Sequence, residues 1–180
     1  MKYNLIPIAL MISSFFISVA QADTILGIHA RKWHAWISVT VNGTTTFYGV
    51  WKDGNRRVGH NGGGKNDLRI NVETFDEAAS SRYDRLTSNQ VNQLNALLNQ
   101  NAKWGVWKNC AWWASRIVRK VVGEDVDANK WLGIPDPEEV CNNINDLEAK
   151  NPTSHLMPDV SRSNKSCSSG SGSSSSSSSW

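Results

Sequence analysis

The stretch that decides the fold is residues 33–51, WHAWISVTVNGTTTFYGVW. Two runs rich in β-branched and aromatic residues flank Asn42-Gly43, the dipeptide preferred in a type I′ turn because both central residues take positive φ. A two-residue turn sets the register so that His34 falls opposite Trp51. We therefore predict an antiparallel hairpin here, with His34 at one end of its first strand.

Further elements follow along the chain. Residues 68–75 (LRINVETF) alternate enough to predict another strand. Residues 87–101 predict a helix that opens with a capping box, in which Thr87 and Gln90 exchange side-chain and backbone hydrogen bonds. A last helix is expected to start at Asp136, followed by proline and two glutamates. The sum is an α+β domain, a small antiparallel sheet packed with at least three helices.

A helix between these two carries a cysteine at its first turn, in residues 108–120, KNCAWWASRIVRK. Asn109 is a good N-cap and Gly123 a good C-cap, which places Cys110 at the first helical position. The positive end of the helix dipole favours the thiolate there. The free backbone N–H groups of that turn can also hold an oxyanion. A nucleophile of this kind needs a histidine in hydrogen-bond reach, and His34 is the candidate.

Other interpretations of Cys110 stay open. A lone cysteine on an apolar helical face is most often part of the core. The chain has three cysteines, so at least one is free or paired between chains. A bond between Cys141 and Cys167 would leave Cys110 free, but the sequence does not establish that pairing.

The ends of the chain predict an exported protein. Residues 1–22 have one lysine, an apolar run and a small-x-small site ending at Ala22, and are expected to be a signal peptide. A single domain is expected over residues 23–160, and a disordered serine-rich tail over 161–180. Without Lys2, 18 basic residues face 16 acidic ones. That balance does not favour nucleic-acid binding, and the apolar run is too short for stable membrane insertion. We expect a periplasmic or secreted location.

The pair formed by His34 in HAWISV and Cys110 in NCAWWAS resembles the circularly permuted branch of the papain-like superfamily, which includes permuted NlpC/P60 enzymes. The resemblance covers about residues 29–123. It implies a permuted papain-like arrangement, with Cys110 as nucleophile and His34 as general base and acid. A third residue should orient the histidine from the neighbouring strand.

That third residue is expected to be Asp53, because it is the polar residue of that face that lies diagonally across from His34. His29 and His60 are the next candidates for the role.

The resemblance implies a function as well. Members of the superfamily mostly cleave amide bonds, and many exported bacterial ones cut peptidoglycan peptides. We therefore expect a thiol hydrolase, an amidase or endopeptidase of the cell wall, whose partner is peptidoglycan or a peptide substrate. Such chemistry needs no cofactor and no metal, and the histidines have no zinc-like spacing with the cysteines. A toxin aimed at competing cells would also have a protein inhibitor as partner.

Two rival interpretations remain. One is an enzyme of the same fold that transfers acyl chains or acts on lipids. The other is a non-enzymatic wall-binding module, in which the tryptophan-rich body is functional and Cys110 is core packing. The second predicts an unreactive Cys110 far from His34, whereas a hydrolase requires the two side chains to meet.

Overall fold

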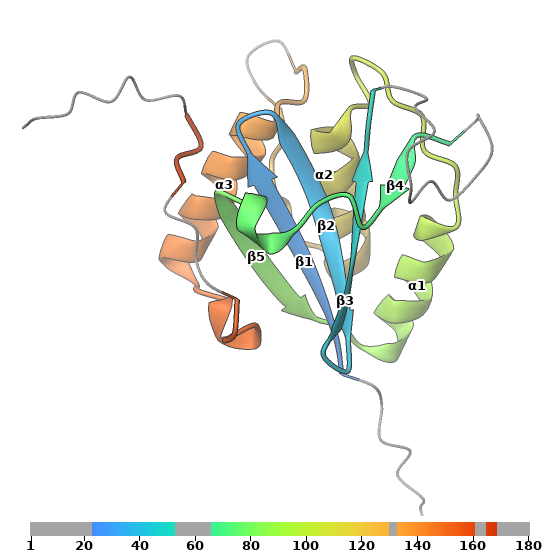
Figure 1. The fold of residues 1–180 in the computed structure, drawn as a ribbon, viewed down its shortest axis with the longest axis vertical. Coiled ribbons are helices and arrows are strands. Elements are labelled where there is room, and N and C mark those ends of the chain that lie inside the picture. The colour runs from blue at the N-terminus through green and yellow to red at the C-terminus, as the bar shows by residue number, and fades with distance from the viewer. Residues whose placement is uncertain (1–22, 53–65, 130–132, 161–164, 169–180) are drawn as a thin grey trace, which may run out of the picture.

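The computed structural model describes residues 23–52, 66–129, 133–160 and 165–168, and Figure 1 shows them as one α+β body. Five antiparallel strands form an open sheet in the order β4-β3-β2-β1-β5. The strands are β1 (Thr24–Arg31), β2 (His34–Val41), β3 (Thr44–Val50), β4 (Leu68–Ile70) and β5 (Ser80–Arg85). The helices are α1 (Ser88–Leu98), α2 (Cys110–Val122) and α3 (Pro137–Lys150), with short 3-10 turns η1 (Phe75–Glu77) and η2 (Ser154–Leu156). The expected α+β class is confirmed. The expected leader, Asp53 and His60 lie outside the described residues.

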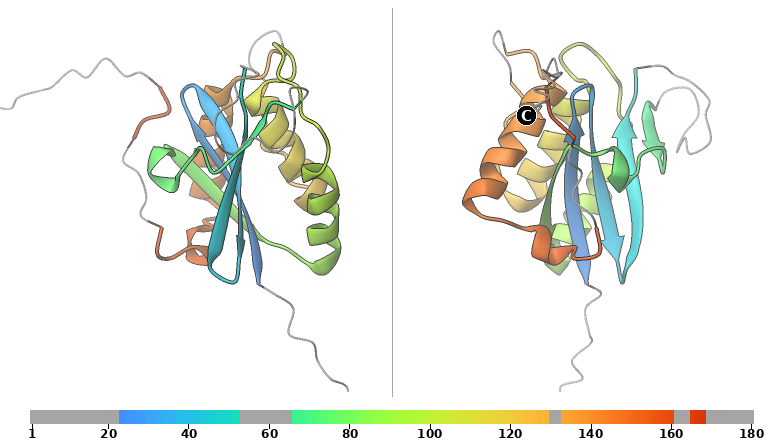
Figure 2. Two further views of the ribbon diagram at one scale, coloured as in Figure 1. Left: turned by 45° about the vertical axis from the view of Figure 1, so that its right-hand side comes forward. Right: turned by 60° about the vertical axis from the view of Figure 1, so that its left-hand side comes forward.

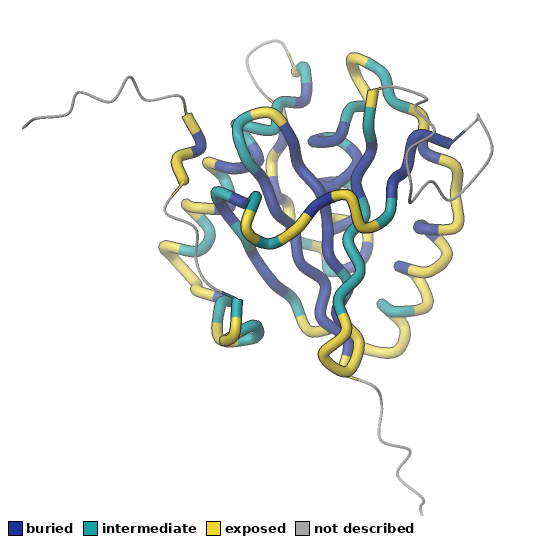
Figure 3. Tube along the Cα trace, in the orientation of Figure 1, coloured by how far each residue is buried: buried dark blue, intermediate teal, exposed yellow. Residues whose placement is uncertain are grey.

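The predicted hairpin is β2 and β3. Asn42 and Gly43 take positive φ, 49° and 81°, as a type I′ turn requires. Strand β1 was not anticipated, although it pairs with β2 along its whole length. Its sequence, TILGIHAR, lacks alternation because almost every residue is buried, and both of its faces are therefore covered. Figure 3 shows this continuous burial at the centre of the sheet.

The helices cover one face of the sheet. Helices α2 and α3 pack on the strands and α1 packs against α2, an arrangement visible from the side in Figure 2. The apolar residues of β1 and β2 that face them meet buried residues of the helices. This core includes Leu26, Ile28, Ala35, Ile37, Leu94, Ala114, Ile117, Val118, Val140 and Ile144.

The opposite face is covered by the connection from β4 to β5. These strands lie at opposite edges of the sheet, so residues 71–79 must cross it, and Figure 1 shows the crossing in front of β2 and β1. The strand predicted over residues 68–75 is therefore too long. It ends at Ile70 because Asn71 takes a left-handed φ of 56° and turns the chain out of the sheet. Glu73 enters the interior on this crossing segment.

The three predicted helices are confirmed, and one of them, α1, is shorter than predicted. The capping box of Thr87 and Gln90 is present, and α1 ends at Leu98 rather than at Asn101. In α3, Asp136 caps the start by accepting a hydrogen bond from the backbone N–H of Glu138 at 2.9 Å. The sequence signals for helix starts were thus reliable, because capping is a local interaction.

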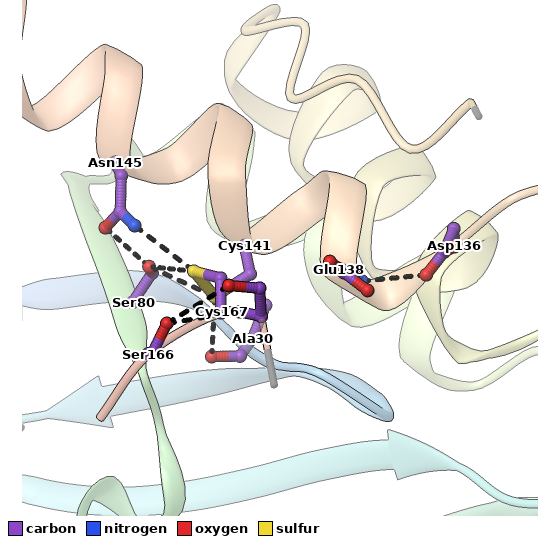
Figure 4. Close-up of a disulfide and its surroundings, with 9 residues drawn as sticks. Ala30, Ser80, Asp136, Glu138, Cys141, Asn145, Ser166 and Cys167 are labelled. Carbon is purple, nitrogen blue, oxygen red and sulfur yellow. Dashed lines mark hydrogen bonds between the residues drawn. A yellow bond between two sulfur atoms is a disulfide. The ribbon is translucent and has the colours of Figure 1, made fainter. Parts of the chain in front are cut away.

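A disulfide joins Cys141 of α3 to Cys167, so Cys110 is the free cysteine. Figure 4 shows the bond between α3 and β5, with two polar side chains against it. The Ser80 hydroxyl lies 3.3 Å from both sulfurs and donates to the amide oxygen of Asn145 at 2.6 Å. The bond therefore attaches residues 165–168, which belong to the expected tail, to the folded body.

A buried ion cluster ties β5 to the helices. The guanidinium of Arg82, 4% exposed, donates two hydrogen bonds of 2.6 Å to Glu124 and one of 2.8 Å to Glu148. A buried guanidinium requires such partners, since its charge is otherwise costly to desolvate. The sequence carried no signal for this cluster, because its members are 42 and 66 residues apart.

Candidate functional site

Helix α2 begins at the candidate nucleophile, and two contacts determine where it begins. The side-chain oxygen of Asn109 accepts a hydrogen bond from the backbone N–H of Trp112 at 3.1 Å, as an N-cap does. The side-chain nitrogen of Asn109 donates to the carbonyl of Pro135 at 2.6 Å. The predicted cap is confirmed, and Cys110 is the first residue of the helix, with the dipole's positive end at its sulfur.

His34 is the first residue of β2, directly after the β1–β2 turn. This turn and the loop that enters α2 lie at the same edge of the molecule, uppermost in Figure 1. The side chains of Cys110 and His34 lie close together there, near enough for each to shift the pKa of the other. Both are nearly buried, at 6% and 4% exposure. The imidazole is held between two indoles, with ring centroids 5.6 Å from Trp36 and 4.2 Å from Trp51.

The two side chains shift each other's pKa. Burial lowers the pKa of His34, but hydrogen bonds and charge attraction from Cys110 and Glu73 outweigh it and raise the pKa to about 9. Burial likewise opposes the thiolate, yet the hydrogen bond and charge of His34, with backbone contacts at Ala35 and Ala111, lower the pKa of Cys110 overall. The pair therefore favours a thiolate beside an imidazolium.

Glu73 orients the histidine. Its Oε1 accepts a hydrogen bond from Nε2 of His34 at 2.8 Å and another from the indole N–H of Trp51 at 2.8 Å. The carboxylate is 1% exposed, and its Oε2 has no hydrogen-bond partner among the described residues. Since Nε2 is taken by Glu73, Nδ1 is the nitrogen left for Cys110. The three side chains thus lie in the order that a nucleophile, its base and an orienting acid would take.

Gly49 makes this contact sterically possible. It lies opposite Trp36 on β3. A Cβ at this position would lie 1.9 Å from Oε1 of Glu73 and 3.0 Å from Nε2 of His34. Because Gly49 has no side chain, the carboxylate of Glu73 can occupy the space beside His34.

The sequence had identified two of these three residues. Cys110 and His34 are brought together as expected, but Asp53 lies outside the described residues. Glu73 occupies the orienting position that had been assigned to Asp53. It was missed because the segment around it was interpreted as a strand, and because 39 residues separate it from His34. Its presence as the one acid of the stretch LRINVETF was the one available signal.

His29, a further candidate for the orienting role, is held by other partners. His29 hydrogen bonds through Nδ1 to Ser81 at 2.8 Å and through Nε2 to Ser38 at 2.7 Å. Burial lowers the pKa of His29 to about 3, so the ring is neutral. His155 is exposed in η2. Among the described residues no group of three potential metal ligands converges.

Comparison of the chain with protein-family models, with curated proteins and with solved structures finds no match. Within the described part of the chain, no helix combines the length and apolar character needed to cross a membrane. Function must therefore be inferred from the chemistry of Cys110, His34 and Glu73. A thiol with a lowered pKa at a helix start, with an imidazole and a carboxylate behind it, is the kind of arrangement that acyl transfer uses.

Proposed function

We propose that this protein is a thiol hydrolase that cleaves amide bonds through Cys110. The observation that carries the proposal is the buried arrangement in which His34 lies beside the thiol of Cys110 and hydrogen-bonds to Glu73. A buried cysteine that only fills space has no need of a histidine at its sulfur, nor of a buried carboxylate behind that histidine. The same contact weighs against a wall-binding module with an inert Cys110.

The reaction would run in two steps. The thiolate of Cys110 attacks the amide carbonyl, and the oxyanion is held by N–H groups at the start of α2. The imidazolium of His34 donates its proton to the leaving amine, which gives a thioester. Neutral His34 then takes a proton from water, and the resulting hydroxide attacks the thioester and releases a carboxylic acid. Glu73 keeps the ring oriented and stabilises its cation throughout.

Peptidoglycan peptides are the substrate class we propose. The support is the resemblance of the His34 and Cys110 motifs to permuted papain-like enzymes, together with a leader sequence expected to direct export. The order of elements is compatible with that arrangement, since the hairpin with the histidine precedes the helix with the cysteine. On this proposal the protein acts in the periplasm or outside the cell.

The test is digestion of purified peptidoglycan by the native protein and by Cys110→Ala, with products identified by mass spectrometry. Native protein should create new amine and carboxylate ends, and Cys110→Ala should create none. A matched control is Ser115→Ala, which removes a buried hydroxyl on the same helix that has no hydrogen-bond partner in the described structure. Cleavage that persists in Cys110→Ala would refute the proposal.

A substrate-independent measurement complements this test. Because Cys141 and Cys167 are bonded to each other, iodoacetamide can modify Cys110 alone. Native protein should react at pH 6–7, well below the ordinary thiol pKa of 9.0, since His34 favours the thiolate. If alkylation follows an ordinary thiol titration, the thiolate–imidazolium pair is absent.

A further inference from the structure

A hollow lies between the end of α1 and α2, and its lining includes none of Cys110, His34 and Glu73. Its volume is about 200 Å³. The floor is apolar and includes Leu97, Trp113 and Ile117, while the rim carries Lys108, Trp112 and Arg116. The hollow therefore combines apolar and aromatic side chains with polar and cationic ones, which make up the larger share of its surface.

Two cations of this rim lie against an indole rather than against a carboxylate. Lys108 and Arg116 lie over the indole of Trp112, at 6.0 Å and 4.9 Å from its centroid, and neither forms an ion pair among the described residues. Elsewhere Arg82 and Arg85 are paired with carboxylates. The lining also contains Lys103, which pairs with Asp67 at 3.8 Å and so does not add to the charge available to an anion. The indole restrains both cations through cation–π contacts, so they are already positioned for an anion.

This hollow is separate from the thiol. Helical periodicity places Trp112 and Arg116 about 200° and 240° around α2 from Cys110. The thiol faces the sheet, where it contacts His34 and the backbone of Ala35. Ile117, which also lines the hollow, shares the face of Cys110 but lies seven residues, about two turns, further along α2. The contact proposed at Arg116 is therefore on a different face of the helix from the sulfur.

We propose that the hollow between α1 and α2 binds an anionic small molecule, with a carboxylate or phosphate at Lys108 and Arg116 and a compact apolar body on the floor. Arg116 favours such groups because its planar guanidinium donates two hydrogen bonds in parallel. A simple hydrated ion would gain nothing from the apolar floor. Both anion chemistries satisfy the same contacts, and the probes below distinguish them.

The experiment is calorimetric titration of the full-length protein with benzoate, phenyl phosphate and neutral benzyl alcohol at low ionic strength. At least one anion should bind saturably at a single site, and the alcohol should bind at least about tenfold more weakly. Tighter binding of benzoate assigns a carboxylate ligand, and tighter binding of phenyl phosphate assigns a phosphate ester. Absence of binding by both anions, or equal binding of the alcohol, would overturn the proposal.

Variants locate the site. Arg116→Gln should weaken the binding of the anion about tenfold. Arg116→Lys keeps the charge but loses the two parallel hydrogen bonds, so its affinity should lie between those of Arg116→Gln and the native protein. Arg119→Gln is the matched control, because Arg119 is an exposed arginine of the same helix that pairs with Asp125. Cys110→Ala should bind as the native protein does, which separates this result from the test of hydrolysis. Equal affinity in Arg116→Gln and native protein would place the anion elsewhere and refute the assignment.

Discussion

Replacement of Glu73 by glutamine would remove the charge behind His34 while keeping the side-chain shape. The carboxylate accepts hydrogen bonds of 2.8 Å from His34 and from Trp51, inside a region from which water is excluded. A hydrogen bond to a charged group contributes about 1.5–3 kcal/mol. The pKa of His34 should therefore fall from about 9 toward its ordinary 6.5. The imidazolium then deprotonates at a lower pH, and the thiolate loses its partner.

The reaction rate should follow the loss of the ion pair. Since about 1.4 kcal/mol corresponds to a tenfold change, Glu73→Gln should lower kcat/KM by about ten- to a hundredfold. The alkylation rate of Cys110 at pH 6–7 should fall, because the pKa of the thiol rises toward 9.0 without the imidazolium. The difference between the native protein and the variant should narrow as the pH rises above 9, because His34 of the native protein then loses its proton as well.

The assay is the pH profile of iodoacetamide labelling, read by intact mass, beside an NMR titration of His34. The matched control is Glu77→Gln, the same change on the same crossing segment. Glu77 is at the surface, where it pairs with Arg31 at 3.7 Å. If Glu73→Gln and Glu77→Gln both keep the native profile, Glu73 does not support the imidazolium and its role as the orienting acid is wrong.

Three further substitutions test the supports of the site. Gly49→Ala should displace the Glu73 carboxylate, since the added Cβ would lie 1.9 Å from Oε1. Its pH profile of Cys110 labelling should therefore match that of Glu73→Gln. Gly105→Ala is the control, because a Cβ there meets no atom within 4 Å. Asn109→Ala should lower the free energy of unfolding by about 2 kcal/mol by removing a cap and a second hydrogen bond, and Asn109→Ser should restore about half. Replacing both Cys141 and Cys167 by serine should lower the free energy of unfolding by about 3.5 kcal/mol, because the disulfide closes a loop between residues 26 positions apart. The labelling of Cys110 should not change. A native labelling profile in Gly49→Ala, an unfolding midpoint unchanged in Asn109→Ala, or slowed Cys110 labelling in the serine variant would contradict these arguments.

Local signals in the sequence were sufficient for several elements. The Asn42-Gly43 turn set the hairpin, and Thr87, Asn109 and Asp136 marked three helix starts. Each signal works through residues within four positions of one another, where turn geometry and capping operate. The same locality placed Cys110 at a helix start and His34 at a strand start, which made them a candidate pair before any contact was known.

Tertiary structure decided the rest. Strand β1 was not predicted because it is buried on both faces, by the helices on one side and the crossing segment on the other. Burial on two sides removes the alternation of polar and apolar residues that identifies a strand. Glu73 reaches His34 because β4 and β5 lie at opposite edges of the sheet, so that the segment joining them must cross its face. The sequence by itself therefore singled out Cys110 and His34 as the candidate pair, each from its local context. The residue that orients the base depends on strand order, and strand order is set by packing between distant segments, which no local pattern encodes.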